Sequence, residues 1–259
     1  MLPATVLGSA VAGAAIALAL LLVGAKFHRR SRLEAQPVLA WFAAFWVGIG
    51  AYGLAEAAWA LAYGAGATDL AVGLFVLHAK IVASVAGFAS LVVYLLLVRG
   101  ADRRFVGALV GAYGLVLALV ETFYAWRDPI AQEPGVWGMR LEYARNSVEP
   151  WWTLLLVVLM LPPFLASLSY ATLLRHARDP VVRWRIQLVS LSLFAFFLPM
   201  FLAWRVGGWP YWGLIEKGLG AVMAGGVVLA MWPPRWARAR LADRETAIAQ
   251  LKERARLLV

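Results

Sequence analysis

The stretch "LAVGLFVLHAKIVASVAGFASLVVYLLLV", residues 70–98, decides how this chain folds. Its only basic residues are His78 and Lys80, and it contains no acidic residue. An α-helix needs about 20 mostly apolar residues to cross the hydrocarbon layer of a bilayer. The stretch therefore predicts one complete transmembrane helix. Other stretches of similar length and apolar character would predict further spans.

The whole chain has a similar character. Of its 259 residues 63% are hydrophobic and 15% are charged, whereas soluble domains average about a quarter charged residues. Seven stretches are long and apolar enough to span: about 4–25, 38–63, 70–98, 104–126, 150–174, 184–206 and 211–232. We therefore expect an all-α, polytopic seven-transmembrane helix bundle over residues 1–233, in the cell membrane, followed by a cytoplasmic helix over 234–259.

The positions of Lys and Arg predict the orientation of this bundle. Most of the 24 basic residues lie in 26–36, 99–104, 175–185 and the tail after 232. The positive-inside rule makes these segments cytoplasmic, with the N-terminus outside and the C-terminus inside. The net charge of +10 therefore comes mainly from basic residues beside the predicted spans, where they determine the orientation of the bundle. No nucleic-acid partner is predicted.

The longest predicted outside loop is "RDPIAQEPGVWGMRLEYARNSVE", residues 127–149. Pro and Gly interrupt its first half, and its later half is predicted to form a short surface helix. A loop of this length is either a lid or binding element or a plain connector, and the sequence leaves both open.

Ionisable residues within the predicted spans point to a pocket. Such residues are costly in lipid and usually face the bundle interior or a cavity. The topology places them at a similar depth in the outer half, which favours an outward-facing pocket over a pore. The candidate residues for binding a small molecule or lipid are Glu56, His78, Lys80, Glu121, Arg205, Glu216 and Lys217, with Trp59, Tyr124 and Trp212 as aromatic walls.

The same residues also have a purely structural interpretation. Glu56 with Lys80, or Glu121 with Lys217, would neutralise each other, and the aromatic residues would form an interfacial belt. Structural pairing and ligand binding are compatible. A lysine in the seventh span invites comparison with retinal proteins, but Lys217 lies within about two turns of the outer end, so no cofactor is predicted.

Catalytic and metal-binding signatures are missing from the sequence. The chain has no cysteine and three histidines, which argues against thiolate or histidine-rich metal sites. It has no glycine-rich phosphate loop and no pair of carboxylates on one predicted helix. We predict neither a metal nor an enzymatic activity. No internal repeat is visible, which weakens the case for a repeat-built transporter.

The tail follows Pro233-Pro234. Positions 241, 244, 248, 251, 255 and 258 read Leu, Arg, Ile, Leu, Ala and Leu, an imperfect coiled-coil seam. This predicts an amphipathic helix, either alone on the membrane surface or pairing as a homodimer through 241–258. The pattern still runs at Leu258-Val259, which fits a link to a cytoplasmic output domain or a tail that recruits a partner protein.

Two segments carry a family resemblance: "HRRSRLEAQPVLAWFAAFWVGIGAYGLAEAAWAL" (28–61) and "LLRHARDPVVRWRIQLVSLSLFAFFLP" (173–199). With the outside N-terminus and the coiled tail, the chain resembles the seven-helix N-terminal sensor regions of bacterial histidine kinases and related signalling proteins. The resemblance implies a membrane receptor that relays a signal to a cytoplasmic transmitter, which these residues do not include.

We therefore predict a bacterial sensory or receptor module. The alternatives are a small-solute or ion transporter that uses the same charged residues, and a structural or assembly subunit whose tail docks a partner.

Overall fold

The computed structural model describes residues 3–136, 138–144, 149–175, 177, 179–206, 212–237 and 239. Within these ranges it describes all side chains except those of residues 124, 149–156, 158–159, 166, 199–206 and 212. The predicted seam over 241–258 lies outside the described residues, so the coiled-coil tail stays a prediction.

The chain is mostly helical, as the sequence predicts. Its elements are α1 (Ala4–Leu33), α2 (Val38–Gly64), α3 (Leu70–Val98), α4 (Arg103–Trp126), β1 (Pro129–Pro134), β2 (Met139–Tyr143), α5 (Glu149–Thr172), the short 3-10 helix η1 (Leu173–Arg175), α6 (Pro180–Val206) and α7 (Trp212–Met231). Over the described residues, six helices are long and apolar enough to cross a membrane: α1 to α4, α6 and α7. Their length and composition mark a multi-pass membrane protein. A seventh span through α5 and the orientation of the bundle stay predictions.

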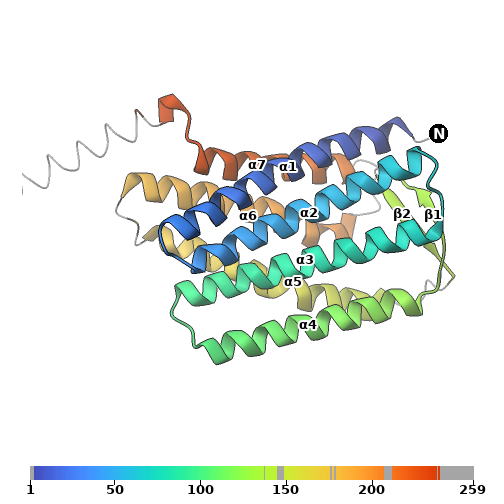
Figure 1. Ribbon diagram of the computed structural model, residues 1–259, viewed down its shortest axis with the longest axis horizontal. Helices are drawn as coiled ribbons and strands as arrows, with labels where there is room; N and C mark the ends of the chain where they lie inside the picture. The colour runs from blue at the N-terminus through green and yellow to red at the C-terminus, as the bar shows by residue number, and fades with distance from the viewer. Residues whose placement is uncertain are drawn as a thin grey trace, which may run out of the picture.

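The helices form one bundle in which the first and last are neighbours. α1 packs against α2 and α7, α2 against α3, and α6 against α7, while α5 contacts α3, α4 and α6. The helices run roughly along one direction, with the strands at one end of the bundle (Figure 1). α4 lies at the edge, and it is the least buried of the six candidate spans.

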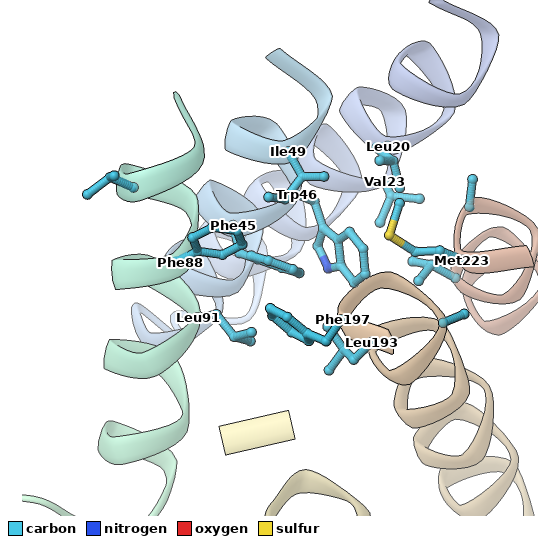
Figure 2. Close-up of a cluster of buried hydrophobic side chains, with 14 of the residues drawn as sticks. Leu20, Val23, Phe45, Trp46, Ile49, Phe88, Leu91, Leu193, Phe197 and Met223 are labelled. Carbon is cyan, nitrogen blue, oxygen red and sulfur yellow. The ribbon is translucent and has the colours of Figure 1, made fainter. Parts of the chain in front are cut away.

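Aromatic side chains fill the middle of the bundle. Phe45 and Trp46 of α2 are fully buried with ring centroids 4.7 Å apart, and Phe88 of α3 lies 5.9 Å from Phe197 of α6. Figure 2 shows these rings between α2, α3 and α6, with Met223 of α7 on the far side of Trp46. Lipid tails are as apolar as this core, so the rings hold the helices together mainly by van der Waals packing.

Local sequence signals place two helix boundaries. Asp69 and Asp102 immediately precede α3 and α4, and their Oδ1 atoms accept hydrogen bonds from the backbone N–H groups two residues later. These are N-caps, which satisfy donors that a helix start leaves without partners. Gly100 takes a φ of +75° in the turn between the two helices, a conformation that favours glycine.

The loop between α4 and α5 corrects one expectation. Its later half is not a surface helix, because Met139–Tyr143 forms β2, antiparallel to β1. Met139 and Leu141 are buried while Arg140 and Glu142 are exposed, the two-residue alternation of a strand with one packed face. The fold is thus a helical bundle with a β-hairpin, and the purely all-α expectation is wrong at this point.

Glycines bring α2 close to both of its neighbours. A Cβ atom added to Gly48 would lie 2.7 Å from the Ala83 carbonyl oxygen and 2.8 Å from the Gly87 Cα atom of α3. A Cβ atom at Gly50 would lie 3.0 Å from the Ala17 carbonyl oxygen of α1. Small residues of this kind let membrane helices approach through their backbones.

The backbone contact at Gly48 predicts the direction in which a substitution there changes stability. Gly48→Ala should lower the free energy of unfolding by about 1–3 kcal/mol, because the added methyl group meets backbone atoms that cannot move aside. Gly107→Ala on α4 is the matched control, since its Cβ atom would meet nothing within 4 Å. There the change should be neutral or stabilising by up to about 1 kcal/mol, from helix propensity alone. Thermal unfolding in detergent measures both, and equal melting temperatures would contradict the close contact.

Candidate functional site

The predicted site residues fall into three groups in the structure. Glu56 and Lys80 meet between α2 and α3, His78 and Glu121 meet between α3 and α4, and Glu216 and Lys217 face a cavity beside α7. The side chains of Tyr124, Arg205 and Trp212 lie outside the described part of the structure. The groups differ in how far the protein itself satisfies their charges.

Glu56 and Lys80 form a largely buried ion pair. The Lys80 ammonium donates to Oε2 of Glu56, and the two side chains are 12% (Lys80) and 20% (Glu56) exposed. The ammonium also lies 5.0 Å from the ring centre of Tyr52 and 5.5 Å from that of Trp59, at distances typical of cation–π contacts. The pairing that the sequence suggests for these two residues is therefore present.

The β-hairpin is docked on this ion pair. The indole N–H of Trp59 donates to Oε1 of the buried Gln132 at 2.7 Å, and Nε2 of Gln132 donates to the carbonyl oxygens of Ala67 and Asp69. A Cβ atom at Gly138, in the hairpin turn, would lie 2.7 Å from Oε1 of Glu56. The hairpin thus covers the ends of α2 and α3 at this end of the bundle (Figure 1).

An aromatic–cation contact supports the base of the hairpin. The Arg127 guanidinium lies 3.8 Å from the ring centre of Tyr143. Burial raises the pKa of the Tyr143 hydroxyl to about 12, although the positive charge of Arg127 acts in the opposite direction. Tyr143 is therefore neutral near pH 7 and presents its ring to Arg127.

His78 and Glu121 join α3 to α4. Nε2 of His78 lies 2.8 Å from Oε2 of Glu121, and Nδ1 lies 2.6 Å from the carbonyl oxygen of Leu74. A carbonyl oxygen only accepts, so Nδ1 must carry a proton. Both ring nitrogens of His78 then face oxygen atoms, one from its own helix and one from α4.

A cavity of about 240 Å³ lies between α1, α2, α6 and α7. Its walls are mainly apolar, with a few polar groups from α2 and α7. They comprise Gly13, Ile16, Ala17, Leu20, Ile49, Tyr52, Gly53, Ala195, Phe196, Glu216, Lys217, Gly220 and Met223. An apolar cavity of about 150 Å³ can hold benzene, so this volume suits a small molecule or a single hydrocarbon chain.

The charges at this cavity are less satisfied than the others. Lys217 is half-buried, and its Nζ lies 3.8 Å from the position a Cβ atom would take at Gly13 of α1. Among the described residues no carboxylate lies within ion-pair distance of Lys217. The alternative pairing of Glu121 with Lys217 is not formed, because Glu121 contacts His78 instead. Glu216 is exposed beside the cavity.

Tyr52 connects the cavity to the buried ion pair, and sequence reasoning missed it. Its side chain lines the cavity, and the charges of Lys80, Glu56 and Glu216 all act on its hydroxyl group. One sequence signal was available, because Tyr52 precedes Glu56 by four residues and so shares its helix face. Gln132 was also missed. It is a polar residue at an inward position of a strand, which a predicted loop could not reveal.

No family model, curated protein or solved structure matches this chain. The described residues contain no cluster of three or more His, Cys, Asp or Glu side chains that could hold a metal ion.

The hydrogen bonds of Gln132 predict how firmly the hairpin is held. Gln132→Ala removes the acceptor of the Trp59 indole N–H and should destabilise the docked hairpin by about 1–3 kcal/mol, the usual effect of a buried group without a partner. Hydrogen exchange of residues 129–143 should then become faster, while the helix core stays protected.

Glu133→Ala is the control for this change. Glu133 pairs with Arg140 at the surface, where an ion pair contributes roughly 0–1 kcal/mol. Equal acceleration of exchange in both variants would mean that the Gln132 side chain does not anchor the hairpin.

Proposed function

We propose that this protein is a membrane sensory or receptor module that binds a small molecule or lipid in the α1/α2/α6/α7 cavity. The observation that carries the proposal is the cavity itself, in which an apolar wall meets Lys217, a cation with no carboxylate partner among the described residues. Small-molecule sites combine mostly apolar walls with a few fixed polar groups in the same way.

The proposed ligand has a polar group and an apolar part. Its polar group would meet Lys217 and Glu216 at one end of the cavity, with Tyr52 beside them. Its apolar part would pack against Leu20 of α1 and Met223 of α7, which both line the cavity. Such a ligand replaces solvent or lipid at an ammonium group that no described carboxylate neutralises, which favours binding.

Transmission of the signal would run along α7. This helix lines the cavity with Glu216, Lys217, Gly220 and Met223, and it ends at Met231, directly before Pro233-Pro234 and the tail. A ligand that fits one position of α7 better than another would shift the population towards that position. The predicted amphipathic tail would then pass this change to a second copy or to a cytoplasmic partner.

A matched pair of substitutions on α7 tests the proposal. Gly220 lines the cavity, and a Cβ atom there would lie 3.5 Å from Ile16 Cδ1, whereas a Cβ atom at Gly218 would meet no described atom within 4 Å. Gly220→Leu should fill the cavity and lower ligand retention at least about tenfold, equivalent to about 1.4 kcal/mol. Gly218→Leu should leave retention unchanged. Native mass spectrometry of molecules that stay bound to the purified chain measures this.

The same variants separate the alternative functions. Retention that is equal in both variants would contradict the cavity as the binding site. Solute flux into reconstituted vesicles that Gly220→Leu abolishes would favour the transporter. A label on Trp232 reports the position of the end of α7. If ligand binding is lost and this label does not change position, transmission through α7 is contradicted.

A further inference from the structure

A basic and aromatic cluster lies at the end of the bundle opposite the hairpin, where α1, α6 and α7 meet (Figure 1). We call Lys26, Arg30, Trp184, Arg185 and Trp232 the basic cluster. All three of its cations are half-buried, and the charges of Arg185 and Arg30 act directly on Lys26. Like charges that act on one another in this way repel, and an anion among them would relieve the repulsion.

The described protein residues supply few acceptors to this cluster. Arg30 pairs with Glu34 at 2.6 Å, and the Lys26 ammonium donates to the Met231 carbonyl oxygen at 2.7 Å. Within the described ranges, no carboxylate lies at ion-pair distance from Lys26 or Arg185.

Two N–H donors of the cluster are buried without any partner. They are the Nε group of Arg185 and the Nε1 group of Trp184, both unpartnered among the described residues. Buried donors in folded proteins nearly always have an acceptor, and a buried charge without a partner is costly. An anion that accepts hydrogen bonds would satisfy both donors and the charge of Arg185.

A phosphate group has this chemistry. Its oxygens are negatively charged acceptors, and the planar fork of an arginine binds them in charge-assisted pairs. The surroundings agree with a lipid source. Trp232 lies under the Lys26 ammonium at 3.9 Å, and Trp184 packs edge-on against Trp236 at 6.3 Å. Tryptophans gather at the headgroup level of membranes, and basic pockets between membrane helices bind acidic headgroups.

We propose that the basic cluster binds the phosphate headgroup of an anionic phospholipid, with Arg185 and Lys26 as its main contacts. The lipid would add a stabilising function at the exit of α7, because Lys26 also holds the last carbonyl group of that helix. This site is separate from the cavity between α1, α2, α6 and α7, so either proposal can fail without the other.

The test uses the full chain in nanodiscs of phosphatidylcholine with and without phosphatidylglycerol. Native mass spectrometry counts the phosphatidylglycerol molecules that stay bound after transfer to detergent. Arg185→Gln should lower their retention at least about tenfold, the effect expected from about 1.4 kcal/mol. Arg183→Gln is the matched control, since Arg183 is an exposed arginine two residues away on the same helix. It should change retention by less than about twofold, as surface charges contribute little.

Two further measurements identify the source of the phosphate and provide a second variant in case the first does not fold. Inorganic phosphate added to the detergent solution should not displace the bound lipid, and displacement at millimolar concentration would show a site for free phosphate instead. If Arg185→Gln does not fold, Lys26→Gln replaces it with the same expected loss. Retention that is equal in the wild type, Arg185→Gln and Arg183→Gln, or equal losses in both arginine variants, would overturn the proposal.

Discussion

The ion pair between Lys80 and Glu56 is the interaction on which the hairpin end of the bundle depends. It joins α2 to α3 with both side chains largely buried, and removing either partner would leave a buried charge at a cost of about 3–5 kcal/mol. Tyr52 and Trp59 surround the ammonium, and Trp59 in turn holds Gln132 of the hairpin. The helix contact, the aromatic packing and the docked hairpin are therefore one connected structure.

This pairing also determines which charged residues remain available for a ligand. Lys80 and Glu56 satisfy each other, and Glu121 lies against His78. Lys217, also predicted to lie in the outer half of the membrane, has no carboxylate within ion-pair distance among the described residues, and it borders the cavity. The charges that looked equivalent in the sequence thus divide into structural pairs and one cavity-facing group. That division, rather than charge alone, identifies the candidate site.

The sequence predicts the extent of the apolar helices well and the rotation about each helix axis poorly. Apolar length located α1 to α4, α6 and α7 closely, because a span of fixed length is a strong constraint. Hydropathy contains almost no information on which face of a helix meets which neighbour, since lipid and core are equally apolar. Glu121 could therefore be matched with Lys217 from depth alone, although α4 presents it to His78 of α3. The hairpin was missed for a different reason: the alternation in "MRLEY" covers only five residues, too few to outweigh the expectation of a surface helix.

The position of α1 connects the two proposed binding sites. Near one end Gly13 lies beside the Lys217 ammonium, and near the other Lys26 holds the Met231 carbonyl oxygen and covers Trp232. α1 and α7 thus contact each other close to both sites. If a ligand in the cavity shifts α7 along α1, it must change the geometry at Lys26 and hence the affinity of the basic cluster for a phosphate. Thermodynamic linkage makes this relation reciprocal, so an anionic lipid would alter ligand affinity by the same factor. A receptor of the proposed kind would respond to its membrane as well as to its ligand.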